Sequence, residues 1–214
     1  MTETGLTLRE RKKLRTRRAL VEEALRLFSE RGFAETTLDE LVDSVEVSQR
    51  TFFRNFSSKE DVALAPEREL WAAYIADIES RPADGLVLAD FQDILFGAVA
   101  GMAEGWERRF VVSRALCDRT PALVAHSLKH CAQVTDRVVE RLARGDRERE
   151  LPLRLTFELM LSAWRWALRQ WSAAYEDGAG PGREELYGRM RTAFATIPRV
   201  TELTVSQARV GLAG

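Results

Sequence analysis

The sequence TLDELVDSVEVSQRTFFRNFSSKED, residues 37–61, predicts two short helices joined by a tight turn and followed by the start of a third helix. Thr37 stands three residues before Glu40, a spacing at which each side chain accepts the backbone N–H of the other. We therefore expect the first helix to begin directly after Thr37. Ser48 is the next N-cap candidate, which leaves residues 44–47 as the turn. The pattern is that of a helix-turn-helix.

The helix that follows Ser48 carries polar side chains around the apolar Phe52, Phe53 and Phe56. Polar side chains on a short exposed helix are what DNA base edges and phosphates require. We expect contacts to base edges from Gln49, Arg50, Thr51 and Asn55. Contacts to the DNA backbone are expected from Thr37, Ser48, Phe53, Arg54 and Lys59.

A basic cluster precedes this motif. Residues 8–18 contain one acidic residue, Glu10, and seven basic residues: Arg9, Arg11, Lys12, Lys13, Arg15, Arg17 and Arg18. Such a cluster neutralises phosphates and releases counterions, which gives salt-dependent attraction to any DNA sequence. The net charge of -1 carries less weight than this uneven distribution. The alternative, a solvated charged helix end, is less favoured because the cluster lies next to the helix-turn-helix.

The run RTFFRNFSSKEDV, residues 50–62, and the basic first helix together resemble the DNA-binding signature of the tetracycline-repressor (TetR) family of bacterial transcriptional regulators. The resemblance in motifs spans about residues 8–64, and the rest of the chain matches in length and helical pattern. Two positions depart from the family. Glu46 stands where the family usually has glycine, and a left-handed backbone there costs roughly 1 kcal/mol without glycine, so either the turn is slightly reshaped or the strain is tolerated. Phe53 stands where the family often has tyrosine, so a hydroxyl directed at a phosphate is missing.

The fold class expected is all-α, because runs with the period of a strand are nearly absent. We expect a DNA-binding domain at 1–58, a helical ligand-binding and dimerisation domain at 59–200, and a peripheral tail at 201–214. The helices are predicted at about 8–30, from 59 to Pro82, and at 86–103, 106–118, 121–144, 152–176 and 183–197. The long helix that begins at Lys59 is expected to link the two domains. The glycine-rich residues 178–182 provide the break between the last two helices.

The helix after Pro152 is apolar over much of its circumference, so it needs cover from two directions. The resemblance implies that the last two helices form a four-helix bundle with a second copy of the chain, and that the homodimer binds a palindromic operator with two half-sites. The residues expected at the dimer interface are Leu155, Leu159, Trp166, Leu186, Met190 and Phe194.

The resemblance also implies a pocket for a small-molecule effector in the downstream domain. Its candidate lining residues are Phe91, Leu95, Met102, Trp106, Phe110, Arg114, Phe157, Met160 and Trp164, with Arg114 as an anchor for an anionic group. A stripe of aromatic and methionine side chains at helical spacing is also what an ordinary core looks like. Both interpretations stay open at this point.

Several other classes of site find little support. His126 and His130 have the i, i+4 spacing that can hold a metal, but their polar neighbours favour a pair that faces solvent. Cys117 and Cys131 fit neither a metal motif nor a disulfide framework, so reduced thiols are expected. We expect no catalytic residues, no metal and no cofactor, and therefore no enzyme. With no apolar span and no signal sequence, a cytoplasmic location is expected.

The sequence therefore predicts a ligand-responsive DNA-binding regulator, a repressor that a small hydrophobic or aromatic ligand releases from its operator. The alternative is a helical ligand-carrier or protein-interaction module with a degenerate helix-turn-helix, which Glu46 and Phe53 make conceivable. Salt-dependent binding to duplex DNA separates these two hypotheses.

Overall fold

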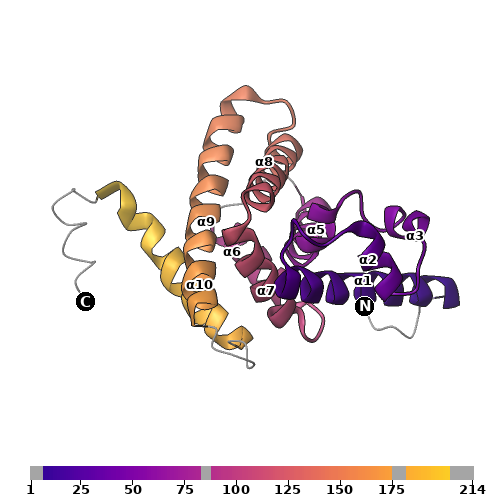
Figure 1. Ribbon diagram of the computed structural model, residues 1–214. Coiled ribbons are helices and arrows are strands. Elements are labelled where there is room, and N and C mark those ends of the chain that lie inside the picture. Colours follow the sequence, from indigo (N-terminus) through magenta and orange to yellow (C-terminus); the bar gives the residue numbers. More distant parts are fainter. Residues whose placement is uncertain (1–6, 83–87, 175–181, 203–214) are drawn as a thin grey trace. The chain divides into compact units, whose positions relative to one another are not determined.

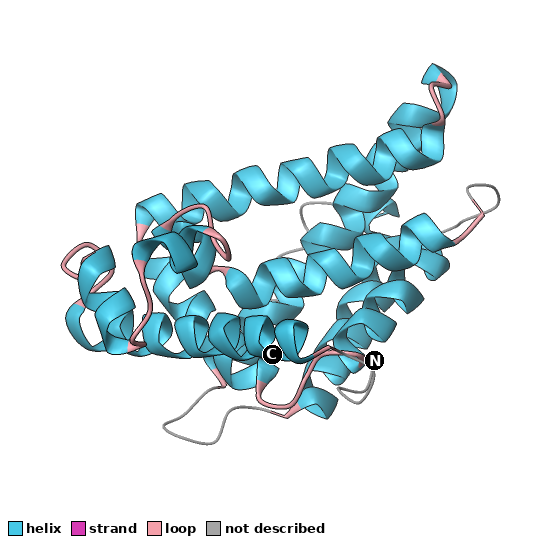
Figure 2. Ribbon diagram, turned by 90° about the vertical axis from the view of Figure 1, so that its right-hand side faces the viewer, coloured by secondary structure: helices cyan, strands magenta, loops and turns pink. Residues whose placement is uncertain are grey.

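The computed structural model describes residues 7–82, 88–174 and 182–202, and these residues form helices joined by short loops (Figures 1 and 2). No strand occurs among the described residues, so the predicted all-α class is confirmed. The α-helices are α1 (Leu8–Arg31), α2 (Leu38–Ser44), α3 (Gln49–Phe53), α4 (Lys59–Ala63), α5 (Ala65–Ser80), α6 (Leu88–Ala100), α7 (Trp106–Arg119), α8 (Pro121–Ala143), α9 (Arg147–Ala173) and α10 (Arg183–Thr196). A 3-10 helix, η2 (Ile197–Glu202), follows α10.

The chain divides into two compact units. The first comprises Met1–Ala73 with Met102–Gln133, and the second comprises Tyr74–Gly101 with Val134–Gly214. The predicted DNA-binding domain, 1–58, falls inside the first unit, which also contains α4, α7, the first half of α5 and the first part of α8. Compactness alone does not define a functional domain, so the boundaries at 58 and 200 stay predictions.

The core of the first unit is built on one face of α1. Val21, Ala24, Leu25 and Phe28 follow helical spacing and are all buried. They belong to a cluster of buried apolar side chains from the neighbouring helices, including Leu41, Phe52, Phe56, Val62 and Leu116. This packing fixes α2, α3 and α4 on α1, and it leaves the opposite, charged face of α1 in solvent.

The predicted single helix from Lys59 to Pro82 is wrong in one respect, because it breaks at Leu64. Leu64 has φ -99° and ψ 13° and separates α4 from α5. Pro66 supplies the reason: proline has no N–H to donate to the carbonyl of Val62, and its ring clashes with that carbonyl in a continuous helix. Proline also disfavours the helical conformation in the residue before it.

The second unit is dominated by α9 and α10, and α10 packs against the C-terminal part of α9 (Figure 1). We predicted that α9 begins at Pro152, but it begins at Arg147 with Asp146 as its N-cap and includes Pro152. The side chain of Asp146 accepts the backbone N–H of Glu148 at 2.9 Å, which explains the earlier start. The predicted break at 178–182 lies outside the described residues except for Gly182, and so does most of the predicted tail.

None of the helices that the structure describes is both long enough and apolar enough to cross a membrane.

Candidate nucleic-acid interface

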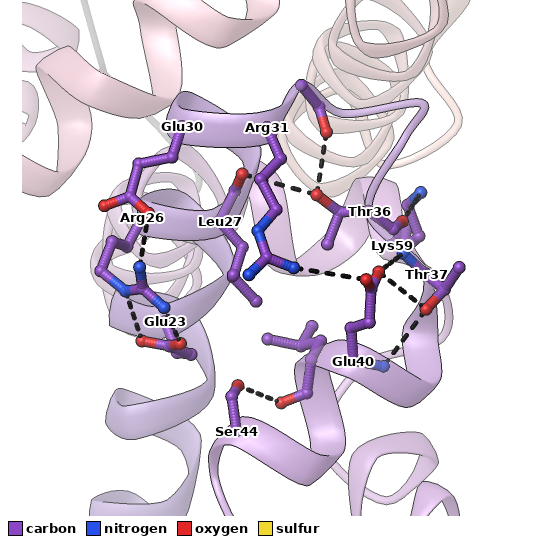
Figure 3. Close-up of polar contacts among 12 residues, drawn as sticks. Glu23, Arg26, Leu27, Glu30, Arg31, Thr36, Thr37, Glu40, Ser44 and Lys59 are labelled. Carbon is purple, nitrogen blue, oxygen red and sulfur yellow. Dashed lines mark hydrogen bonds and ion pairs between the residues drawn. The ribbon is translucent and has the colours of Figure 1, made fainter.

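The helix-turn-helix forms where the sequence predicts it. Thr37 caps α2 with a reciprocal pair of bonds, in which the Thr37 hydroxyl accepts the N–H of Glu40 at 3.2 Å and the Glu40 carboxylate accepts the N–H of Thr37 at 2.8 Å (Figure 3). Ser48 caps α3, because its hydroxyl accepts the N–H of Thr51 at 3.2 Å. Both predicted caps are confirmed.

The turn between the two helices contains a left-handed residue. Glu46 has φ 55°, which is the conformation that the family usually reserves for glycine. The turn closes on it with two backbone bonds, from Glu46 N–H to the Asp43 carbonyl and from Val47 N–H to the Val42 carbonyl. The turn thus keeps its shape, and the residue bears the strain of roughly 1 kcal/mol.

Helix α3 is anchored by its aromatic side and presents a polar side to solvent. Phe52 and Phe56 are buried against the core with ring centroids 5.7 Å apart. The exposed positions recur at i, i+1, i+4 and i+5, so they share one side of the helix. They are Gln49, Arg50, Phe53 and Arg54. Phe53 is 54% exposed, so a large apolar side chain occupies the edge of this polar side.

A cleft of about 480 Å³ lies between the start of α1 and the end of α3. Its lining residues are Arg9, Lys12, Lys13, Thr16, Thr51, Arg54 and Asn55. Four of these are basic and none is acidic, so the cleft favours an anion such as a DNA phosphate. The structure therefore brings the basic cluster and the exposed side of α3 together within one unit.

Several predicted contact residues instead hold the motif itself. The Asn55 side-chain amide donates to the Thr51 carbonyl at 2.8 Å, and its Oδ1 atom is buried without a hydrogen-bond partner in the part of the chain that the structure describes. The amide of Asn55 is therefore directed back along α3, and its contact with a base stays a prediction. The Thr51 hydroxyl lies 3.1 Å from that of Ser48. Gln49 donates its amide to Asp39 on α2, so it reaches a base only if this exposed bond opens.

Arg17 is also engaged inside the protein. Its guanidinium donates to the Asn55 carbonyl at 2.7 Å, lies 4.2 Å from the centroid of the Phe56 ring, and approaches Glu69 at 3.9 Å. The other predicted basic contacts on α1, namely Arg9, Arg11, Lys12 and Lys13, are exposed. The cluster thus divides into an exposed set near the start of α1 and one half-buried residue, Arg17, that positions the end of α3.

Lys59 has a structural role that differs from the phosphate contact we predicted. Its ammonium group donates to the carbonyls of Phe33 at 2.7 Å and Thr36 at 2.5 Å, and it lies 4.6 Å from the Phe33 ring centroid. Burial lowers the pKa of Lys59 from its ordinary value. Figure 3 shows Lys59 beside Thr36, at the loop that leads into α2. Two backbone carbonyls and an aromatic face occupy this cation, so it fastens that loop.

The sequence did not single out three residues that the structure places at this interface. Thr16 lines the basic cleft, and its position one turn after Lys12 on α1 is a signal that could have found it. Asp39 binds Gln49 from the neighbouring helix. Asp61 accepts the backbone N–H of Ser57 at 3.0 Å behind α3. The last two contacts depend on how separate helices pack, which spacing along the chain does not reveal.

The candidate pocket residues fall into both compact units. In the second unit Phe91, Leu95, Phe157, Met160 and Trp164 are buried. In the first unit Trp106 stacks on Phe110 with centroids 4.7 Å apart and donates its indole N–H to the Pro66 carbonyl at 3.0 Å. Arg114 is paired with Asp118 at 2.8 Å and with Glu67 at 3.5 Å, and Met102 is half-buried. Their role as a pocket stays a prediction.

The candidate dimer residues divide by exposure. Leu155, Leu159 and Trp166 are 56%, 42% and 38% exposed on α9, and Leu151, which we did not predict, is 63% exposed on the same helix. Leu186, Met190 and Phe194 on α10 are buried within their own chain, so they cannot themselves face a partner.

The two histidines do not form the solvent-facing pair that we expected. The Nε2 atom of His126 lies 2.9 Å from Asp61 Oδ1 and 3.2 Å from the Arg68 guanidinium, and both histidines are half-buried. The described residues hold no group of three or more His, Cys, Asp or Glu side chains that could bind a metal ion.

A capped helix-turn-helix with an exposed polar side, next to a basic cleft and carried by an all-helical chain, defines a DNA-binding protein. Residues 20–65 match the bacterial regulatory proteins of the tetR family. Over 209 residues the chain is 32% identical to the HTH-type transcriptional regulator TcmR of Streptomyces glaucescens, covering 89% of this chain and 92% of TcmR. The chain therefore belongs to the TetR family of DNA-binding transcriptional regulators.

One solved structure of a TetR-family regulator shows the same fold. A TetR-family regulator of Mesorhizobium loti is 16% identical, with a TM-score of 0.50 over 88% of this chain and 97% of that one. GusR of Salmonella enterica is 19% identical, with a TM-score of 0.48 over 89% and 97% of the two chains.

Proposed function

We propose that this protein is a homodimeric repressor that binds a palindromic operator and is released from it by a small hydrophobic or aromatic ligand. The observation that carries the DNA-binding part is the exposed side of α3, with Arg50 and Arg54, next to the basic cleft at the start of α1. Phosphates held at the cleft would fix the register of α3, and base contacts from its exposed side would supply specificity.

The proposal of a homodimer rests on α9. Leu151, Leu155, Leu159 and Trp166 recur at helical spacing and are 38% to 63% exposed, which is a large apolar stripe for a surface helix. A second copy of the same helix, related by a twofold axis, would cover the stripe with an identical one. One helix-turn-helix contacts few base pairs, so two copies are needed for two half-sites about one helical turn apart.

The proposed effector pocket lies around the aromatic cluster of the second unit. The Phe157 ring lies 5.9 Å from that of Tyr74 and 6.0 Å from that of Phe91. The Tyr74 hydroxyl has two acceptors within reach of its single proton, the Phe91 carbonyl at 3.4 Å and the Met160 sulfur at 3.7 Å, both long contacts. Burial raises the pKa of the Tyr74 phenol well above its ordinary value, so the hydroxyl stays protonated. An aromatic ligand with a hydrogen-bond acceptor suits this cluster.

Such a ligand acts only through a difference in its affinity for two states of the protein. Because Phe91 and Phe157 are packed in the described state, the ligand would favour a state in which these rings separate. Release of DNA then requires that this second state hold the two α3 helices at a spacing that no longer fits the operator.

Selection of binding sites from random DNA duplexes at two salt concentrations tests the DNA-binding proposal. The expected result is a palindromic consensus whose half-sites are separated by about one turn of DNA, or a multiple of it, and an affinity that falls steeply with salt. Weak binding without a consensus would contradict the proposal and favour the helical carrier or interaction module. A variant with Lys12 and Lys13 replaced by glutamine is the matched control, because it should keep the consensus and lose affinity.

A further inference from the structure

The carboxylate of Asp61, only 6% exposed, connects several elements of the first unit. Its Oδ2 atom accepts the N–H of Ser57 at 3.0 Å and also the Ser57 hydroxyl. Its Oδ1 atom accepts the Arg68 guanidinium from α5, and His126 on α8 lies 2.9 Å from the same oxygen. A buried carboxylate needs such partners, because an unpaired charge in the interior is strongly unfavourable. The position of each partner is therefore constrained by the others.

Ser57 lies directly after the segment that ends the recognition helix α3. The N–H of Phe56 donates to the Phe52 carbonyl at 2.9 Å, which continues the helical turn beyond Phe53. The Phe52 and Phe56 rings also contact each other in the core. A restraint on the backbone of Ser57 therefore restrains the C-terminal end of α3, where Arg54 is exposed.

His126 brings α8 into this arrangement. Its Nε2 atom lies near both Asp61 Oδ1 and the Arg68 guanidinium, at 2.9 Å and 3.2 Å. One ring nitrogen can donate to Asp61 when it carries a proton or accept from Arg68 when it does not, but it cannot do both. Two bonding arrangements of similar geometry therefore compete at this point. Helix α8 continues to Ala143, and from Val134 onward its residues belong to the second unit.

His130 lies on the same face of α8 as His126. It lies one turn after His126, and its Nε2 atom is buried without a hydrogen-bond partner among the described residues. A buried nitrogen without a partner is unfavourable. A shift of α8 that brought a polar partner to this nitrogen would relieve it.

We propose that His126 and Arg68 are positioning residues for the recognition helix, acting through Asp61. On this proposal a movement of α8 tightens or loosens the hold of Asp61 on Ser57, and so changes how well α3 fits an operator. The proposal rests on the proposed function, because it assumes that α3 reads an operator and that an effector moves the helices downstream of it.

The test uses the full-length protein with the selected operator and a scrambled duplex of equal length as probes. The variants are His126→Leu, Asp61→Asn and the double variant. Arg137→Leu is the matched control, because it removes another ion pair of α8, with Glu79 at 2.7 Å, that does not touch the segment after α3. The first readout is the rate of hydrogen exchange at the Ser57 amide, compared with the rate at the Leu25 amide in the α1 core. The second readout is the ratio of the affinity for the operator to the affinity for scrambled DNA.

His126→Leu is expected to speed exchange at Ser57 but not at Leu25, and to lower the ratio of operator to scrambled affinity about tenfold, the loss expected for one charge-assisted hydrogen bond. The double variant should lose little more than either single variant, because the residues act in one chain of contacts. Arg137→Leu should leave the exchange and the ratio unchanged. Should His126→Leu fail to fold, His126→Gln, which keeps an amide but not the ring, replaces it and is expected to change both readouts in the same direction.

Unchanged exchange at Ser57 and an unchanged affinity ratio in a folded variant would overturn the proposal, as would equal effects of Arg137→Leu. Failure of the proposed function looks different: the wild-type protein would select no operator, whereas the exchange at Ser57 would still show whether His126 holds that segment.

Discussion

The Arg17 guanidinium on α1 donates to the carbonyl oxygen of Asn55 at 2.7 Å, and it also lies over the Phe56 ring. One arginine of the basic cluster thus fastens the end of the recognition helix, whereas its neighbours are exposed to solvent. The two kinds of residue should respond differently to the same substitution.

Arg17→Met should lower the free energy of unfolding by roughly 1 to 3 kcal/mol, because a charge-assisted hydrogen bond and a cation–π contact are lost while the apolar stem is kept. Arg11→Met, at an exposed position, should change it by less than about 0.5 kcal/mol. Arg11→Met should instead reduce the salt dependence of DNA binding by about one phosphate contact. Urea denaturation and titrations with DNA at several salt concentrations measure these quantities. Equal losses of stability in both variants would contradict the assignment.

Substitutions of Arg50 and Asn55 should distinguish a residue that recognises a DNA base from one that stabilises α3. Arg50 is exposed on α3, so Arg50→Ala should relax the preference at one operator position, with a loss of about 1 to 3 kcal/mol there. Asn55 donates to the Thr51 carbonyl, so Asn55→Ala should lower stability and leave the consensus unchanged. Site selection with each variant measures the preference, and a consensus altered by Asn55→Ala alone would show that the roles are reversed.

The sequence predicted the elements that depend on local spacing. The caps at Thr37 and Ser48 follow from neighbours within a few residues, and the structure confirms them. Glu46 takes the left-handed conformation, so of the two alternatives for this turn the strain is tolerated. The structure gives Lys59 and Asn55 contacts to backbone carbonyls that the sequence did not indicate, and their roles in DNA binding stay predictions. Such roles depend on contacts between helices, and these contacts cannot be inferred from the spacing of residues in a single sequence.

Lys59→Met should destabilise the protein by about 2 to 3 kcal/mol. The ammonium group donates to the carbonyls of Phe33 and Thr36, and the substitution removes that donor. The salt dependence of DNA binding should stay as in the wild-type protein, because Lys59 makes no phosphate contact on this assignment. Lys12→Met provides the comparison, with normal stability and a smaller salt dependence. If urea denaturation shows Lys59→Met to be as stable as the wild type, and its DNA binding depends less on salt, the predicted phosphate contact of Lys59 is supported instead.

The exposed stripe on α9 should control assembly. Replacing both Leu155 and Leu159 with glutamate places charges where two copies would meet, so the protein should become monomeric and lose most of its operator affinity. Leu128→Glu on α8 is the matched control, since Leu128 is 58% exposed and lies off the stripe. Analytical ultracentrifugation measures the assembly. A doubly substituted protein that stays dimeric would place the interface on another surface.

His130 should make the protein sensitive to mild acid. Its pKa is lowered from 6.5 to about 4, first by burial and then by Arg68 and His126. Between these values the unfolded chain binds more protons than the folded one, so the free energy of unfolding rises with pH. The stability that depends on a neutral His130 is fully present above pH 6.5 and is lost as the pH falls toward 4. For a fully buried group, this pKa difference would correspond to a loss of about 3 kcal/mol in the free energy of unfolding. For a half-buried side chain we expect roughly 1 to 2 kcal/mol.

Urea denaturation of the wild-type protein and His130→Leu across this range measures the effect, because titrating groups that the variant leaves unchanged cancel in the difference between the two curves. The leucine variant should lose less stability on acidification, since it has no imidazole to protonate and no buried nitrogen that lacks a partner. Parallel curves from neutral pH down to pH 4 would mean that His130 is protonated as readily in the folded protein as in the unfolded chain.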